Sequence, residues 1–294
     1  MTGIAFIGAG RVASTLARAF VANGVPVAAI ASRNDASARR LAQRVRGADA
    51  VSMQDAAAAD LVFLTVPDDD IATVCDTLAW RDGQAVVHCS GATEVAVLDA
   101  AARRGALIGG FHPLQTFADP DRAVELLAGT TVAIEGPASL AATLRELAER
   151  LGMKPLSVPP GARAAYHGGA SFAAGFIASM FEEAAAMWAS FGIDERATLD
   201  ALLPLARGAL ASVESRGIAG AVSGPVSRGD AGVVARHLAA FDAQGPDHGR
   251  FYREFARRAL KLAIADRRID AAQVARMRAV LDAEPIPEPG VRPS

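Results

Sequence analysis

The sequence predicts an α/β fold: a doubly wound, mainly parallel sheet followed by an all-helical C-terminal domain. Short apolar runs typical of strands alternate with amphipathic helical patterns up to about residue 158. From Ala162 to about Leu281 this alternation stops, and Ala-rich helical segments follow one another. Strands that alternate with helices pair in parallel through crossovers, so we expect ligands at the carboxyl ends of the strands.

Each predicted element follows from its local pattern. The strands are expected at 4–8, 27–31, 61–66, 85–88, 107–111, 132–134 and 156–158, with a shorter one at 50–53. The helices between them are expected at 12–22, 36–45, 71–78, 94–103 and 140–151. We expect a sheet domain over 1–159, a helical domain over 160–283 and a Pro-rich, disordered tail over 284–294.

The first helical segment of the second half, about 164–191, is apolar almost all round. Such a helix predicts burial on every side, either in a bundle or against a partner subunit. Its most apolar part, 170–181, is too short to span a bilayer and ends in Glu182 and Glu183.

A glycine-rich turn connects the first predicted strand to the first predicted helix. The segment Gly8-Ala9-Gly10-Arg11-Val12-Ala13 has the G-x-G-x-x-A spacing of dinucleotide-binding turns. Gly8 permits the tight turn, Gly10 permits close approach of a pyrophosphate, and Ala13 lets the helix lie close to the sheet. The N–H groups and dipole of the helix favour phosphate. The residues expected to contact the cofactor are Gly8, Ala9, Gly10, Arg11, Val12, Ser32, Arg33, Val66, Pro67 and Ser90.

The end of the second strand indicates which dinucleotide is bound. NAD-binding units have an acidic residue there, whereas this strand ends in Ala31, Ser32 and Arg33. Ser32 and Arg33 can hold a 2′-phosphate, which favours NADP(H) over NAD(H). Two alternatives remain: Arg33 is a surface arginine with Asp35 capping the next helix, or Asp35 reaches the ribose.

Composition and charge exclude several classes of protein. The net charge of −2 gives no indication of a nucleic-acid or membrane partner. Cys75 and Cys89 have no metal or redox spacing, and no histidine pair has the spacing of metal ligands. The chain enters a strand at once, so we expect no signal peptide and a cytoplasmic location. A hydrolase elbow G-x-S-x-G is absent from the sequence.

Two strand ends carry candidate catalytic residues. After strand 85–88, Ser90 either contacts substrate or nicotinamide or caps the next helix, while His88 is expected to point into the sheet. At the next strand end, His112 is a candidate proton donor because histidine titrates near neutrality. Gln115 is a candidate for orienting the substrate.

Two further candidates lie in the second half. His167, beside Tyr166, either faces the site or forms a hydrogen-bonded pair with that tyrosine. Arg228 in Gly224-Pro225-Val226-Ser227-Arg228-Gly229-Asp230 either clamps a substrate carboxylate or pairs with Asp230, which then caps the next helix.

Together, His88-x-Ser90-Gly91-Ala92, His112-Pro-Leu-Gln-Thr-Phe117, Tyr166-His167 and Gly224-Pro-x-x-Arg228-Gly-Asp230 resemble a family of two-domain, Rossmann-like oxidoreductases described as short-subunit-dehydrogenase-like. The chain is more distantly similar to pyrroline-5-carboxylate reductase, deazaflavin-dependent NADP oxidoreductase and the 6-phosphogluconate dehydrogenase superfamily. This resemblance implies an NADP-binding domain, a helical domain that builds a homodimer, and 2-oxo acids as candidate substrates. Two departures are the absence of the superfamily's Lys and Asn on the first helix of the helical domain and Ala174-Gly175 where the family tends to have Asn.

These observations predict an NADP(H)-dependent oxidoreductase that reduces C=O or C=N in a small carboxylate-bearing metabolite. The predicted catalytic residues are His112, Ser90, His167, Gln115 and Arg228, and no metal or nucleic acid is expected. Hydride transfer depends mainly on positioning and charge stabilisation. The alternative is a nucleotide-binding sensor or scaffold that keeps the fold without catalysis, which the departure at Gly175 favours.

Overall fold

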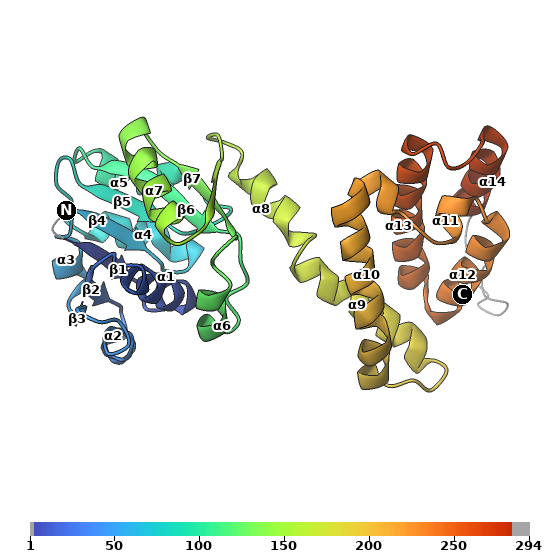
Figure 1. Cartoon of the computed structure of the whole chain (residues 1–294), viewed down its shortest axis with the longest axis horizontal. Coiled ribbons are helices and arrows are strands. Elements are labelled where there is room, and N and C mark those ends of the chain that lie inside the picture. The colour runs from blue at the N-terminus through green and yellow to red at the C-terminus, as the bar shows by residue number, and fades with distance from the viewer. Residues whose placement is uncertain (1–2, 284–294) are drawn as a thin grey trace, which may run out of the picture. The chain divides into compact units, whose positions relative to one another are not determined.

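A computed structural model describes residues 3–283 of the chain; the predicted tail, 284–294, lies outside the described residues. The chain divides into two compact units, one ending at Gly175 and the other beginning at Phe176 (Figure 1). The first contains a sheet with its helices, and the second contains helices. The fold class is therefore as the sequence predicts.

The first unit is built on an eight-stranded sheet with the order β3-β2-β1-β4-β5-β6-β7-β8. All neighbouring strands are parallel except β6 and β7, which are antiparallel. The chain reverses its direction of winding at β1, where β2 and β4 lie on opposite sides, and ligands of doubly wound folds bind at this point. The strands are β1 (Ile4–Ile7), β2 (Val27–Ala31), β3 (Asp49–Ala50), β4 (Leu61–Leu64), β5 (Ala85–His88), β6 (Leu107–Pro113), β7 (Thr131–Glu135) and β8 (Lys154–Ser157).

Helices cover both faces of this sheet because successive side chains of a strand point to opposite faces. On one face Phe6 and Phe63 stack with ring centroids 5.1 Å apart, and Phe20 and Phe111 pack against this pair. This face carries α1 (Arg11–Ala22), α2 (Asp35–Ala42) and α7 (Ala138–Arg150). The opposite face carries α3 (Met53–Ala56), α4 (Ile71–Thr77), the 3-10 turn η2 (Val95–Leu98) and α5 (Asp99–Ala102).

Three further segments follow the ends of strands β4, β6 and β8. The 3-10 turn η1 (Asp68–Asp70) follows β4, and α6 (Pro120–Glu125) lies between β6 and β7. Asp121 of α6 forms ion pairs with Arg18 and Arg44, which hold α6 against α1 and α2. The sequence analysis missed α3 and α6, each of which is no more than two turns long. α8 (Arg163–Ser171) ends the first unit, whereas the sequence suggests a domain boundary at 159/160.

The second unit has its own core. Buried side chains from α11 (Pro225–Arg228), α12 (Ala231–Gln244), α13 (Pro246–Ala265) and α14 (Ala271–Asp282) form it, among them Val234, Leu260 and Met277. α14 begins with a capping box in which Asp270 and Gln273 bond to each other's backbone N–H groups. The remaining helices are α9 (Gly175–Ala189) and α10 (Glu195–Ala221), which bends at Gly217 (φ 71°).

The predicted helix over 164–191 is wrong as a single continuous element. It is interrupted between α8 and α9, where residues 172–174 form i→i+3 hydrogen bonds, consistent with the low helix propensity of nearby Gly168, Gly169 and Gly175. Its side chains are also not buried within the chain, since no residue of α9 is buried among those described. No helix within residues 3–283 has both the length and the hydropathy needed to cross a membrane.

Candidate functional site

The glycine-rich turn between β1 and α1 lines a pocket of about 220 Å³ at the carboxyl ends of β1, β2 and β4. Gly8 has φ 111°, and a Cβ there would lie 2.5 Å from the backbone of Thr65, so only glycine fits. Gly10 is different, because a Cβ there would meet no atom within 4 Å. The open space beside Gly10 is where a pyrophosphate needs to approach the backbone.

The first turn of α1 fits an anion. Its N-cap, Gly10, provides no side-chain hydrogen bond, and the turn contains no acidic residue. The unpaired N–H groups at this helix end are therefore available to a phosphate and lie at the positive end of the helix dipole. The residues present thus fit the pyrophosphate of a dinucleotide.

The end of β2 places both predicted 2′-phosphate ligands in this pocket. Ser32 and Arg33 line it together with Ser37, and Arg33 forms a 3.2 Å ion pair with Asp70 of η1. The N-cap of α2 is Asn34, which accepts from the N–H of Ser37, so the reading of Asp35 as the cap is wrong.

The other predicted cofactor contacts divide into two groups. Ala9, Val66 and Pro67 line the same pocket as Gly8 and Gly10. Arg11, Val12 and Ser90 are not among the residues that line it. Arg11 lies at the start of α1, and Ser90 lies two residues beyond β5.

A second pocket of the first unit, about 470 Å³, lies at the end of β6. His112 and Gln115 line it from β6 and the following loop, and His167 and Ser171 line it from α8. The rings of His112 and His167 meet edge to face with centroids 5.6 Å apart. Three of the five predicted catalytic residues therefore share one pocket.

His112 forms a hydrogen bond with Tyr166, for which the sequence suggested His167 as a possible partner. Its Nδ1 lies 3.0 Å from the hydroxyl of Tyr166, so that tyrosine pairs with His112 rather than with His167. Burial, followed by the charges of His167 and Arg163, lowers the pKa of His112 to about 4, and Asp68 opposes this shift. Near neutral pH the pocket therefore contains a neutral imidazole, whose hydrogen position depends on the bond at Nδ1.

Gly91 makes the histidine pair possible. A Cβ at this position would overlap His167 Cδ2 and lie 2.8 Å from Nε2 of His112. Any larger residue would push the two rings apart, so this glycine is a steric requirement of the pocket. This steric role of Gly91 was not predicted from the sequence.

Ser90 connects the end of β5 to the turn η1 through its side chain. Its hydroxyl lies 2.6 Å from Asp68 Oδ2 and 2.8 Å from Thr93 Oγ1, and it accepts from the N–H of Thr93 at 3.0 Å. Asp68 belongs to η1, the same turn that carries Asp70 of the nucleotide pocket. Ser90 therefore closes a local turn and ties the end of β5 to the turn after β4, but it does not cap the next helix, because η2 begins after Glu94 without a side-chain capping bond.

His88 points into the sheet, as predicted. It is fully buried, and its Nδ1 accepts from the N–H of Ser90 at 3.2 Å. Burial, with smaller contributions from Arg163 and His112, lowers its pKa to about 3. Its Nε2 has no hydrogen-bond partner among the described residues.

Gln115 and Arg228 are engaged elsewhere in the structure. The amide nitrogen of Gln115 donates to the carbonyl of Leu126 at 3.2 Å, and its oxygen accepts from the N–H of Thr116. Arg228 lies in the second unit and pairs with Asp230 at 2.8 Å. Asp230 makes no side-chain capping bond to α12, so only the pairing half of that alternative is observed.

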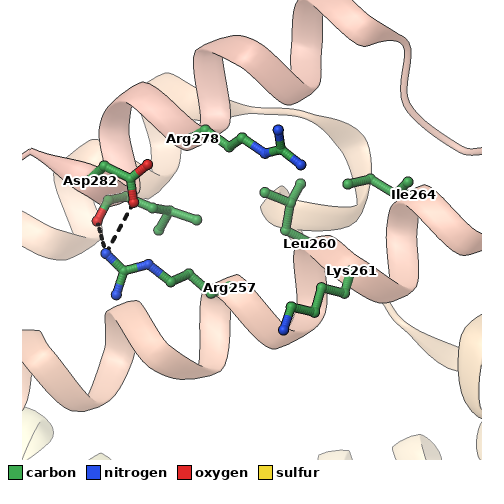
Figure 2. Close-up of a pocket in the computed structure, with 7 residues that line it drawn as sticks. Arg257, Leu260, Lys261, Ile264, Arg278 and Asp282 are labelled. Atoms are coloured by element: carbon green, nitrogen blue, oxygen red, sulfur yellow. Dashed lines mark hydrogen bonds and ion pairs between the residues drawn. The ribbon is translucent and has the colours of Figure 1, made fainter.

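A pocket of the second unit, about 200 Å³, holds none of the predicted site residues. Figure 2 shows Arg257 of α13 hydrogen-bonded to Asp282, with Leu260 and Ile264 lining the same pocket. Among the residues that the structure describes, no group of three or more His, Cys, Asp or Glu side chains is placed to hold a metal ion.

Two family models match the chain, and the second match extends across the boundary between the two units. Residues 2–113 match the Rossmann-like domain, and residues 130–259 match DUF2520, a domain of unknown function. The first match covers the glycine turn and strands β1 to β6, and the second runs from β7 into α13. No curated protein sequence matches the chain.

Solved structures share this fold over most of their length. A protein of Thermotoga maritima is 24% identical, with TM-score 0.75, and the match covers 90% of this chain and 99% of that one. A candidate NADP oxidoreductase of Bacteroides fragilis is 26% identical, with TM-score 0.69 and coverage of 88% and 98%. An imine reductase of Myxococcus stipitatus, in complex with NADP+, is 20% identical, with TM-score 0.61 and coverage of 94% and 99%.

Proposed function

We propose that this chain is an NADP(H)-dependent oxidoreductase that reduces a C=O or C=N bond in a small metabolite. One observation carries the proposal: a pocket at the glycine turn and a pocket lined by His112 and His167 lie at strand ends of one sheet. The likeness to an NADP oxidoreductase and to an NADP+-bound imine reductase supports it.

Different residues of the chain would bind different parts of the dinucleotide. The turn Gly8–Gly10 and the N-terminus of α1 would hold the pyrophosphate, while Ser32 and Arg33 would hold the 2′-phosphate. When bound, NADPH supplies the hydride. Because Arg33 is already paired with Asp70, a 2′-phosphate would compete with that carboxylate for the guanidinium.

The pocket lined by His112 and His167 would bind the substrate and hold a hydrogen bond to its reacting atom. His112 is neutral near pH 7, so it would act as a hydrogen-bonding imidazole at the reacting heteroatom. The Tyr166 hydroxyl at Nδ1 fixes the ring and, when it donates, leaves the hydrogen on Nε2. His167 lines the opposite side of the pocket.

We propose 2-oxo acids as the first substrates to test and cyclic imines as the second. The expectation of a carboxylate rests on Arg228, which would have to exchange Asp230 for substrate. Turnover of imines alone would favour C=N reduction and remove the assigned role of Arg228.

The function is tested by NADPH fluorescence followed by NADPH oxidation across 2-oxo acids and cyclic imines. We expect binding, oxidation with at least one class, and weaker NADPH binding by Arg33→Ala. Arg39→Ala, at an exposed arginine of the following helix α2 that does not line the pocket, is the matched control. Binding of NADPH without its oxidation in the presence of any compound would contradict the proposed enzymatic activity and support the alternative, a nucleotide-binding sensor.

We also propose that the helices of the second unit form a homodimer. The apolar segment that contains α9 predicted either a bundle or a partner subunit, no residue of α9 is buried among those described, and large apolar side chains of α10 are also exposed, among them Leu205, Leu210 and Ile218. Burial of such surface is the main favourable contribution to association.

A further inference from the structure

Arg163, the first residue of α8, is a fully buried arginine. Its Nε lies 2.6 Å from Glu135 Oε2 on β7, and its Nη1 donates to the carbonyl of Ser90 at 2.8 Å. Its backbone N–H donates to Glu94 Oε1 at 3.1 Å. One residue therefore joins the start of α8 to β7 and to the segment that follows β5.

The sheet leaves room for this guanidinium at a glycine. A Cβ at Gly110 of β6 would overlap Arg163 Nη2. Gly110 pairs with His88 across β5 and β6 and lies two residues before His112. Nη2 itself has no hydrogen-bond partner among the described residues, so the guanidinium is placed by its other contacts and by this space.

The position of Arg163 determines how α8 presents the site residues. Tyr166 and His167 follow it by three and four residues, so all three lie on neighbouring positions of one helical face. A rotation or shift at Arg163 would move the Tyr166 hydroxyl away from His112 Nδ1. It would also move His167 away from its close contact over Gly91.

The charge of Arg163 reaches the same groups. It contributes to the lowered pKa values of His88 and His112, and it lowers the pKa of Tyr166 against the larger, opposite effect of burial. The other groups that act on His112 are His167 and Tyr166 from α8, His88 from β5 and Asp68 from η1. Arg163 and His167 therefore act in the same direction, and Asp68 acts against them.

We propose that Arg163 is a positioning residue of this site, which fixes α8 on the strand ends and keeps a permanent positive charge behind the His112–Tyr166 pair. The kinetic part of this inference rests on the proposed function, but the electrostatic part does not. A buried ion pair that is merely structural would stabilise the fold without controlling His112, since buried pairs often contribute little beyond a well-packed apolar substitute.

The test is an NMR titration of histidine-labelled protein without any ligand, with the His112 signal assigned from a His112→Gln sample. We expect wild type to titrate with a midpoint near pH 4 and Arg163→Met to titrate at a higher midpoint. Arg163→Lys keeps the charge and should restore the low midpoint. It should not restore kcat, because a single ammonium cannot replace the bonds to Glu135 and Ser90. A folded Arg163→Met with an unchanged midpoint would overturn the proposal.

A second variant covers the case in which Arg163→Met does not fold. Gly110→Ala displaces the guanidinium without removing its charge, and Gly169→Ala on α8, where a Cβ meets nothing within 4 Å, is its control. We expect Gly110→Ala, but not the control, to shift the His112 midpoint and to weaken the His112–Tyr166 bond. Identical titrations in Gly110→Ala and wild type would contradict the proposal.

The two proposals fail in different ways. If wild type oxidises NADPH with no compound, the proposed function fails, while the titrations still decide the role of Arg163. If wild type turns over and Arg163→Lys has both the titration and the kcat of wild type, the function stands and the positioning role fails.

Discussion

At the scale of single residues, two His–Tyr pairs of the same geometry allow a controlled comparison. His112 and Tyr166 meet with centroids 5.7 Å apart and an interplanar angle of 89°, and His237 and Tyr252 with 5.7 Å and 87°. Each has a hydroxyl close to Nδ1, at 3.0 Å and 2.8 Å. Only the first of these two pairs lies at the pocket that we propose for the substrate. The effect of losing a tyrosine hydroxyl on catalysis can therefore be separated from its effect on stability.

We expect Tyr166→Phe to lower kcat by roughly ten- to a hundredfold, because loss of the hydroxyl frees the His112 ring and its hydrogen position. Tyr252→Phe removes the matching bond in the second unit and should leave kcat at the wild-type value. Steady-state kinetics and thermal unfolding of both variants are the measurement. Equal losses of kcat in the two variants would argue against a role for Tyr166 in the site.

Stability should fall on acidification because His88 and His112 are kept neutral. In the unfolded chain both histidines titrate near pH 6.5, whereas in the folded protein their pKa values are about 3 and about 4. As the pH falls below 6.5, the unfolded state binds protons that the folded state excludes, so the free energy of unfolding decreases until about pH 3–4. Each unit of pKa difference corresponds to about 1.4 kcal/mol.

Denaturant unfolding of wild type and His112→Gln between pH 7 and about pH 4 measures this effect. We expect the variant to lose less stability than wild type over that range. Parallel curves for wild type and His112→Gln would show that His112 does not have a lowered pKa.

At the scale of elements, the β1–α1 turn contains one glycine that the fold requires, Gly8, and one that we expect cofactor binding to require, Gly10. Gly8 has a positive φ and contacts the backbone of Thr65, whereas Gly10 faces open space and has φ −82°. The same fingerprint therefore contains two different physical requirements.

We expect Gly8→Ala to lower the melting temperature, because a Cβ has no room against Thr65. Gly10→Ala should melt like wild type and bind NADPH at least tenfold more weakly, because its methyl group enters the space for the pyrophosphate. Calorimetric melting and NADPH titration separate the two effects. Undiminished binding by Gly10→Ala would mean that the dinucleotide lies elsewhere.

Elements with a strong local pattern could be predicted from the sequence, and elements defined by tertiary contacts could not. Strands 27–31 and 85–88 were predicted at their observed bounds because they are buried apolar runs that end at polar turns. The interruption between α8 and α9 was missed because an Ala- and Gly-rich apolar stretch has no unique helical end signal.

The same limit applies to the candidate site. His112, Gln115 and His167 could be found from their positions near strand ends or on a helix start, and they share a pocket. Arg163 and Asp68 were missed because their roles depend on contacts with Glu135, Ser90 and Gly110, which are distant in sequence. An arginine in an Arg-rich chain gives no sequence signal of burial.

At the scale of the whole molecule, α9 and α10 carry apolar surface that the second unit's core does not use. That core is formed by α11 to α14, and Thr198 is the buried residue of α10 among those described. A pocket of about 560 Å³ between α9 and α10 is lined by four alanines, Phe181 and Leu199, and by the two glutamates Glu182 and Glu195. Such a surface is typical of helices that pack against a second copy.

Light scattering on a sizing column should give twice the mass of one chain. We expect Leu205→Glu combined with Leu210→Glu to produce monomers, because both leucines are exposed on α10. Leu126→Glu, at an exposed leucine of the first unit, should stay dimeric. A monomeric wild type would contradict the homodimer.

The central claim is that one site receives a nucleotide at the glycine turn and transfers its hydride beside His112. The most direct measurement uses NADPH carrying deuterium on the transferring face of the nicotinamide, with mass spectrometry of the 2-oxo acid and cyclic imine products. We predict one deuterium on the reduced carbon of at least one product, with the label transfer lost in Gly10→Ala. Bound NADPH that keeps its deuterium with every compound would contradict the account.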